Sequence, residues 1–422
     1  MKNSAVQNSG TWKKAVVIGG AYAGLVTARV LADHFSEVVI LERDLVDERT
    51  GTHPSAPQEY HAHALLAKGG EILERFFPGL RAELQEIGAP VFDYGEHLSF
   101  LLPAGFAPRN RTGVEIQAFT RDELERRLRG KVLALPEVTF IPSARCEGLR
   151  MTSSGKVNRV LYRTEGVEQP TEIEADLVVN ASGRSSALDN WLTELGLSVP
   201  EKRVVKAKIT YTSMSFDRSK NGHLVGQIET RTDQGPTHRC TNTNNQWRLY
   251  HKMKDWPDRL IAIGDAVCVF NPVYGQGLTV AALEAELLHR TLTERATRRK
   301  GLDGLARNYQ RAVARILLTP WTLSSNSDLM WNPDHQPLSA RFAHWYNRHF
   351  FEVSVRDAGV WTRFARVANM VAPPTVLFHP SVVAKVFAQA CSTAPGPPTD
   401  NSRRPRPTWP GTPGGTSALP RR

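Results

Sequence analysis

Two glycines near the start of the chain have the spacing of a phosphate-binding turn. Gly19 and Gly24 follow an apolar run, residues 15–18, and open a segment of helical periodicity. They match the first and last glycines of the dinucleotide fingerprint G-x-G-x-x-G, and Ala21 stands at the middle one. The first glycine would allow a tight turn, the last would let helix and strand pack closely, and the helix amides would face a pyrophosphate.

An acidic residue follows at the distance that this fingerprint requires. Glu42 ends a second apolar run, residues 38–41, where a carboxylate would bind the hydroxyls of a ribose. An acid there favours FAD or NAD over NADP, and these residues alone do not separate the first two. The alternative is a glycine-rich turn followed by an ordinary surface glutamate.

A second group of residues suited to a flavin lies over two hundred positions later. The apolar run 260–263 delivers Asp265 to a loop, where its carboxylate could accept hydrogen bonds from a polyol such as ribityl. Pro272, Gly275 and Gly277 predict a compact turn with free amides at the start of the next helix, which suits a developing negative charge on a flavin ring. The alternative is that Asp265 only caps the helix.

Alternating strand and helix patterns surround both motifs and indicate an α/β fold. Residues 15–18, 22–35 and 38–41 predict a βαβ unit with a right-handed crossover. Further elements are predicted as helices at 117–135 and 277–292, strands at 138–141, 157–163, 176–181, 203–215 and 260–263, and mostly helical structure over 319–389.

The composition is that of an ordinary globular protein. The 422 residues, 41% of them hydrophobic, fit two domains or one large domain with an inserted one. Four cysteines without CxxC spacing argue against a disulfide framework or a zinc site. An apolar run of about 18 residues and an apolar signal core are both absent, so a cytoplasmic protein is expected. Apolar clusters in 360–390 are assigned to the core, with shallow membrane association as the minority alternative.

The formal net charge of +11 does not indicate nucleic-acid binding. The segment after Cys391 carries five arginines against one aspartate and is rich in proline, glycine and threonine, so residues 391–422 are expected to be a disordered tail. The remaining charge is interleaved with acids, and no nucleic-acid module is recognisable.

Several stretches together resemble one enzyme family. Residues 59–66 read EYHAHALL, residues 72–80 read ILERFFPGL and residues 264–277 read GDAVCVFNPVYGQG. With Pro320-Trp321 and the APPT of residues 372–375, they resemble the FAD-dependent monooxygenases with the para-hydroxybenzoate hydroxylase fold, in the bacterial and fungal branch that carries GDAVCxFNPVYGQG. The resemblance covers about residues 14–390, with one gap.

The resemblance implies a Rossmann-like FAD-binding domain, an inserted and here shortened antiparallel-sheet substrate domain, and a helical C-terminal region. The expected boundaries are 14–200 and 259–300 for the FAD domain, 201–258 for the substrate sheet and 301–390 for the helical region. It also implies FAD as cofactor and NAD(P)H as co-substrate. The implied cofactor-binding residues are Gly19, Ala21 and Gly24 in the turn, Glu42 at the ribose, Arg121 at the phosphates or ribose, Asp265 at the ribityl or pyrophosphate, and Gly275, Gln276 and Gly277 along the isoalloxazine. A surface charge at a helix start is the alternative for Arg121.

Two features depart from the family pattern. Ser182 stands where the family usually has Asp or Thr, and this change is tolerated because a serine hydroxyl can still form hydrogen bonds. Only 81 residues separate Gly183 from Gly264, fewer than the family usually has, with residues 216–240 as a remnant of the substrate sheet. The short stretch predicts an incomplete pocket, and a mis-spliced gene, a reduced enzyme or an inactive relative would each explain it.

The residues themselves identify no catalytic group. His61 and His63 precede a helix, and further ligands for a metal are not found, so contact with backbone or flavin is favoured over acid–base chemistry. Tyr274 is expected to pack in the flavin loop. The leading hypothesis is a single-component FAD monooxygenase that hydroxylates or epoxidises a hydrophobic or aromatic small molecule with NAD(P)H and O₂, in secondary metabolism. An FAD-dependent reductase of isoprenoid-like double bonds and a truncated non-catalytic relative are the alternatives, whereas the Trp-x-Trp signature of halogenases is absent.

Overall fold

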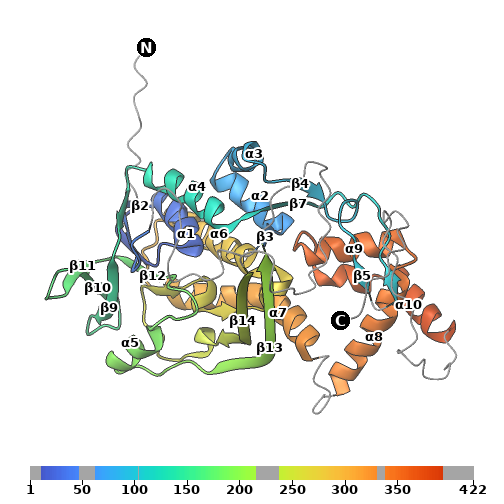
Figure 1. Cartoon of the computed structure of the whole chain (residues 1–422). Helices are drawn as coiled ribbons and strands as arrows, with labels where there is room; N and C mark the ends of the chain where they lie inside the picture. Colours follow the sequence, from blue (N-terminus) through green and yellow to red (C-terminus); the bar gives the residue numbers. More distant parts are fainter. Residues whose placement is uncertain (1–10, 47–61, 103, 215–236, 330–337, 393–422) are drawn as a thin grey trace, which may run out of the picture.

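The parallel sheet of the protein has five strands, in the order β15-β12-β1-β2-β8. Its strands β2 and β12 are labelled in Figure 1. The computed structural model describes residues 11–46, 62–102, 104–214, 237–329 and 338–392. In sheet order the strands are Leu260–Ala262, Leu177–Asn180, Trp12–Ile18, Phe35–Leu41 and Val138–Ile141. Their apolar sequences match a parallel sheet that is covered on both faces.

Helices cover this sheet and carry the chain between its strands. Helix α1 (Tyr22–Ala32) joins β1 to β2, α4 (Arg121–Leu133) precedes β8, and α6 (Gln276–Thr297) follows β15. Helix α1 packs against both α4 and α6, and α7 (Leu305–Leu329) packs against α6 and β15. The carboxyl ends of β1, β12 and β15 therefore open toward the N-termini of α1 and α6, where ligands usually bind in open α/β sheets.

Three antiparallel sheets of three strands each accompany the parallel one. The first contains β9 (Ala144–Met151), β10 (Val157–Thr164) and β11 (Thr171–Glu174), and it contacts β2 and β12. The second contains β3 (Ala62–Leu65), β7 (Glu115–Thr120) and β4 (Val91–Asp93). The third contains β13 (Lys202–Met214), β14 (Thr237–Arg248) and the short β16 (Cys268–Val269).

This third sheet occupies the region expected to hold the shortened substrate sheet. Strands β13 and β14 pair from Lys202 opposite Arg248 to Met214 opposite Thr237, and β16 joins the Arg248 end of β14. Most of the expected remnant, residues 216–240, lies outside the described residues.

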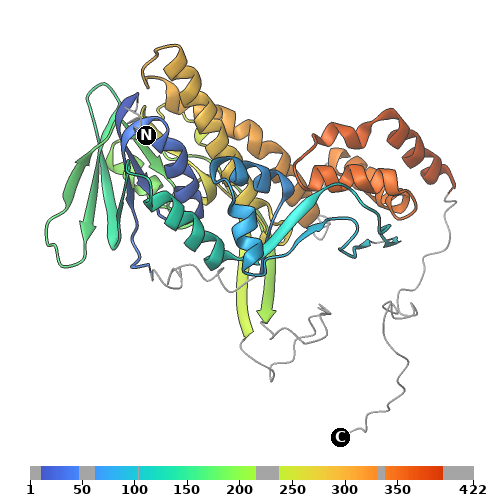
Figure 2. The same cartoon turned by 90° about the horizontal axis from the view of Figure 1, so that it is seen from above.

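The C-terminal helices gather at one end of the molecule, and the β9–β11 sheet lies at the other (Figures 1 and 2). Helices α8 (Leu338–Ser354), α9 (Ala358–Ala368) and α10 (Pro380–Ser392) share a small core of their own. Asn369 joins this unit to α2 (Ala67–Phe76), since its side-chain and main-chain oxygens accept bonds from the amides of Ala67 and Lys68. Within the described ranges, no helix is both long and apolar enough to cross a membrane.

The remaining elements are short. They are α3 (Leu80–Glu86), α5 (Leu188–Glu194), β5 (Leu101–Leu102), β6 (Gly105–Phe106) and 3-10 turns at Tyr250–Lys252, Gly264–Ala266, Pro272–Tyr274 and Pro374–Phe378.

The structure confirms the α/β fold and corrects two predicted elements. The first helix ends at Ala32 instead of continuing to Phe35, because Phe35 begins β2 and pairs with Trp12. The helix expected over 117–135 begins only at Arg121, because the residues before it form β7 between β3 and β4. The domain boundaries stay predictions, and the tail after Ser392 lies outside the described residues.

Candidate functional site

A cavity of about 390 Å³ lies at the carboxyl end of the parallel sheet, where several loops meet. Its walls come from the start of α1, from β3, from the start of α4, from the loops after β12 and β15, and from the start of α6. The lining residues are Ala21, Tyr22, Ala23, His63, Ala64, Arg121, Ala181, Gly183, Arg184, Gly264, Asp265, Phe270, Asn271, Pro272, Gly275, Gln276, Gly277, Leu278 and Ala281.

Six of the nine predicted cofactor-binding residues line this cavity. They are Ala21, Arg121, Asp265, Gly275, Gln276 and Gly277. The other three, Gly19, Gly24 and Glu42, lie in or under the turn that forms one wall. The fold thus brings the two sequence motifs together in one place.

The glycine turn has no room for side chains at its two glycines. Gly19 has a φ of +108°, and a Cβ there would lie 2.5 Å from the carbonyl oxygen of Ala181. A Cβ on Gly24 would lie 1.8 Å from the carbonyl oxygen of Gly19. Ala21 is the N-cap residue of α1 and forms no side-chain cap, so the first amides of the helix are available to an anion in the cavity.

Glu42 lies under the turn and holds it in shape. Its side chain is buried, with one carboxylate oxygen 2.6 Å from the amide nitrogen of Gly20 and the other 2.9 Å from that of Asp44. These two amides donate to the carboxylate, which keeps further lone pairs for ribose hydroxyls. The alternative of an ordinary surface glutamate is therefore wrong.

Arg121 is also not the surface charge that the alternative assumed. Only 16% of its side chain is exposed, it lines the cavity, and its Nε donates to Oε1 of the buried Glu125 at 2.7 Å. This ion pair at i,i+4 holds the start of α4 so that the guanidinium stays at the cavity wall.

Asp265 lies in the turn Gly264–Ala266, half-buried and on the cavity wall. Burial raises the pKa of its carboxyl, and the guanidinium groups of Arg121, Arg184 and Arg248 oppose that rise. Among the described residues, the Asp265 side chain makes no hydrogen bond to α6, whose N-cap residue is Gly275 with a φ of +61°. The helix-cap alternative for Asp265 is therefore wrong.

Two buried polar atoms at this cavity have no partner among the described residues. They are the hydroxyl of Tyr22, which is 2% exposed, and Oε1 of Gln276, which is 5% exposed. Buried polar atoms are rarely left unpaired, and both atoms belong to residues that line the cavity. Burial also raises the pKa of Tyr22, and its hydroxyl stays protonated as a donor.

Sequence reasoning missed Glu284, a carboxyl group beneath the Asp265 loop. It is fully buried in α6, and its Oε2 accepts a 2.6 Å hydrogen bond from the amide of Gly264. Burial and the neighbouring Asp265 raise the pKa of Glu284 to about 8. Glu284 is one of two acids in the largely apolar run of residues 278–288, the other being Glu286, so the sequence alone did not single it out.

The histidines and Tyr274 receive no catalytic role. His63 lies on β3 and lines the cavity, whereas His61 lies outside the described residues. Tyr274 is half-buried next to the cavity and is not one of the residues that line it. In the part of the chain that the structure describes, no cluster of three or more His, Cys, Asp or Glu residues could hold a metal.

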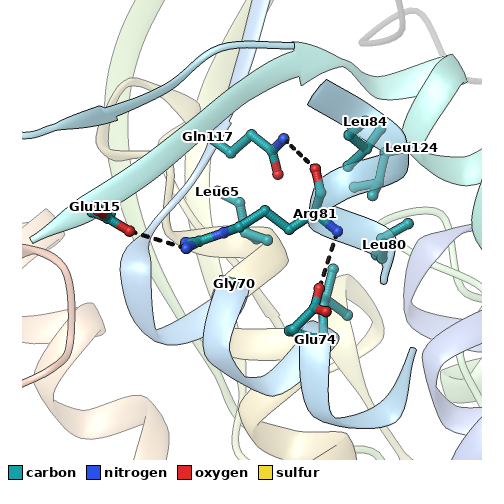
Figure 3. Close-up of a pocket in the computed structure, with 10 residues that line it drawn as sticks. Leu65, Gly70, Glu74, Leu80, Arg81, Leu84, Glu115, Gln117 and Leu124 are labelled. Carbon is teal, nitrogen blue, oxygen red and sulfur yellow. Dashed lines mark hydrogen bonds and ion pairs between the residues drawn. The ribbon is translucent and has the colours of Figure 1, made fainter. Parts of the chain in front are cut away.

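A second, much smaller cavity of about 20 Å³ lies between α2, α3 and β7 and has room for roughly one water. Figure 3 shows Arg81 at its centre, with its guanidinium 3.1 Å from Glu115 and its main-chain oxygen accepting from Gln117. The amide of Arg81 donates to Glu74. These pairs tie α3 to β7, so this cavity is a structural junction.

Comparison with known proteins agrees with this arrangement. The profile of the FAD binding domain family matches residues 13–256, more than half of the chain. Protein Rv3254 of Mycobacterium tuberculosis is 29% identical over 383 residues, covering 75% of this chain and 80% of that protein.

Solved structures share the fold at low sequence identity. The p-nitrophenol 4-monooxygenase PnpA from Pseudomonas putida DLL-E4 aligns with a TM-score of 0.54 at 17% identity, covering 84% of this chain and 97% of that one. CabE, an aromatic hydroxylase from angucycline biosynthesis, aligns with a TM-score of 0.54 at 15% identity, covering 84% and 75%. FAD as cofactor, an oxidoreductase and the family expected from the sequence are confirmed, and the chain belongs to the FAD binding domain family, with the fold of the FAD-dependent aromatic hydroxylases and monooxygenases.

Proposed function

We propose that this protein is a single-component FAD-dependent monooxygenase that hydroxylates or epoxidises a hydrophobic or aromatic small molecule, with NAD(P)H and O₂ as co-substrates, in secondary metabolism. The observation that carries the proposal is that one cavity lies between the glycine turn and the loop 264–277. That cavity combines an anion-binding helix start, a carboxylate suited to hydroxyl groups and a second helix start.

The residues around the cavity fit an FAD molecule. The amides at the start of α1 and the guanidinium of Arg121 would hold its phosphates, and Glu42 would bind the adenosine ribose. Asp265 would accept hydrogen bonds from the ribityl hydroxyls or lie beside the pyrophosphate. Tyr22 and Gln276, whose hydroxyl and Oε1 have no partner among the described residues, lie on the same wall.

FAD, when bound, supplies the activation of oxygen, and the protein binds, orients and shields the reacting groups. Gly275, the N-cap residue of α6, has a φ in the left-handed region, and the helix start that it forms with Gln276 and Gly277 lines the cavity. This helix start would stabilise negative charge that develops on the flavin ring. Phe270, Pro272 and Leu278 form an apolar part of the same wall and would exclude water.

The shortened region between Gly183 and Gly264 is compatible with activity. Strands β13 and β14 pair over most of their lengths, and the last residue of β14, Arg248, lies next to the cofactor loops. A paired sheet at this position supports an enzyme with a small substrate domain over an inactive relative.

Oxygen uptake tests the reaction. Purified holoenzyme is mixed with NADH or NADPH and a panel of phenols and larger aromatic compounds, and dissolved oxygen and nicotinamide oxidation are followed together. We expect at least one compound to accelerate both and to yield a product one oxygen atom heavier. Nicotinamide oxidation with no oxygen uptake, and a substrate double bond saturated, would instead establish the reductase. A flavin-loaded protein inactive with every compound and with isoprenoid alkenes would contradict both.

A further inference from the structure

Arg248, the last residue of β14, makes an unusual set of contacts for a charged side chain. It is only 5% exposed. Its Nη1 donates to the main-chain oxygens of Asp265 and Ala266, at 3.1 Å each, and its Nη2 donates to the main-chain oxygen of Arg184 at 2.8 Å. One guanidinium therefore holds three carbonyl groups.

These three carbonyls belong to two different loops of the cofactor cavity. Arg184 follows β12, and Asp265 and Ala266 follow β15, the neighbouring strand of the parallel sheet. Arg184 and Asp265 both line the cavity. Arg248 itself comes from the antiparallel sheet β13-β14-β16, so a single side chain joins that sheet to both loops.

Burying a guanidinium is costly, and a well-packed apolar residue at the same place is often as stable or more stable. Fold stability alone thus does not call for arginine here. Hydrogen bonds to three carbonyl groups in fixed directions do require arginine, because its planar guanidinium has several N–H donors in fixed positions and the compact ammonium group of lysine does not.

We propose that Arg248 is a positioning residue for FAD, which fixes the Arg184 and Asp265 loops relative to each other so that the Asp265 carboxylate faces the dinucleotide. This inference rests on the proposed placement of FAD in the cavity. It makes the substrate sheet part of the cofactor site, since the clamp begins on β14.

The test uses the full chain stripped of flavin, with Arg248→Met, Arg248→Lys and a matched control, Gln310→Leu. Gln310 is 2% exposed, and its Nε2 donates to the main-chain oxygen of Ala262 at 3.0 Å, on β15 just before the same loop. Both variants thus lose buried hydrogen bonds to main-chain oxygens, three at Arg248 and one at Gln310, and only those of Arg248 reach the cavity loops. FAD affinity is measured by titration and stability by thermal melting.

Loss of charge-assisted hydrogen bonds to the loops should weaken FAD binding by about tenfold or more in Arg248→Met. Arg248→Lys should also bind FAD more weakly than wild type, because its ammonium cannot hold both loops. Gln310→Leu should lower the melting temperature and leave FAD affinity within about twofold.

A pH series separates the charge of Arg248 from its hydrogen bonds. The guanidinium groups of Arg121, Arg184 and Arg248 lower the pKa of the Asp265 carboxyl against the effect of burial, and Asp265 in turn raises the pKa of Glu284. Removing one cation should make Asp265 take up a proton at higher pH, so FAD affinity in Arg248→Met should fall earlier on acidification. Arg248→Lys keeps the cation and should follow the wild-type profile.

The outcomes are distinct. If wild type and Arg248→Met bind FAD with equal affinity, the positioning role is refuted and the proposed function stands. An affinity loss no larger than that of Gln310→Leu also refutes it. Wild type that fails to bind FAD refutes the proposed site. If Arg248→Met does not fold, wild-type affinity in Arg248→Lys overturns the inference.

Discussion

Replacing Glu284 by glutamine tests whether the carboxyl group beneath the cofactor loop is neutral in the folded protein. The Glu284 side chain is fully buried, its Oε2 accepts from the amide of Gly264, and its Oε1 has no partner among the described residues. Burial first, and Asp265 second, raise its pKa from 4.5 to about 8. Glutamine keeps the acceptor for Gly264 and cannot ionise.

The magnitude follows from the size of this rise. At about 1.4 kcal/mol for each unit of pKa, a change from 4.5 to about 8 is worth up to about 5 kcal/mol. Between these values the folded protein holds a proton that the unfolded chain has lost. This contribution to stability is fully present below pH 4.5 and is lost as the pH rises to about 8. Glu284→Gln has no such pH dependence. As the pH rises across this range, its free energy of unfolding should therefore increase relative to that of wild type.

The assay is urea unfolding of the flavin-free protein at several pH values from 5 to 8.5, followed by tryptophan fluorescence. The control is Glu294→Gln on the same helix, where the carboxylate is 59% exposed and pairs with Arg298. We expect the gap to wild type to widen with pH for Glu284→Gln and to stay constant for Glu294→Gln. Parallel pH curves for wild type and Glu284→Gln would refute a neutral, buried Glu284.

Two further substitutions test the cavity itself. Asp265→Ala should weaken FAD binding by about 10- to 150-fold, which corresponds to the loss of about one charge-assisted hydrogen bond. The melting temperature of the flavin-free protein should stay nearly unchanged, since Asp265 does not cap α6. Unchanged FAD affinity in a titration would remove Asp265 from the site. Gly24→Ala places a Cβ 1.8 Å from the Gly19 oxygen, so the turn must open, and the variant should melt at a lower temperature and lose FAD. Its control is Gly277→Ala, where a Cβ meets nothing within 4 Å and which should melt like wild type. Equal melting temperatures for the two variants would contradict the close packing of α1 on β1.

The parts of the site that a short motif encodes could be predicted from the sequence. Gly19 and Asp265 follow the ends of apolar strands, and Gly24 lies in the first turn of the helix after Gly19. Parallel strands bring their carboxyl ends to one edge of the sheet, which is why the two motifs meet. The helix limit at Phe35 was wrong because the strand began three residues earlier than its apolar run, where pairing with Trp12 fixes it. Strand β7 was taken for helix because pairing with β3 and β4 overrode its local pattern.

Groups whose roles depend on distant contacts could not be predicted. Glu284 is beneath Gly264 only because α6 packs against the loop after β15. Arg248 reads as an ordinary charge at a strand end, and its role appears only once β12, β14 and β15 are placed together. A buried charge has no signature in the sequence around it, since its burial is set by elements far along the chain.

Hydrogen–deuterium exchange with and without FAD tests most directly the claim that the dinucleotide lies between the two motifs. We expect FAD to protect amides in three segments, residues 19–24, 183–184 and 264–277, and to leave the β9–β11 sheet and the C-terminal helices α8–α10 unchanged. Protection confined to segments outside the cavity, or no change with saturating FAD, would contradict this placement of the cofactor.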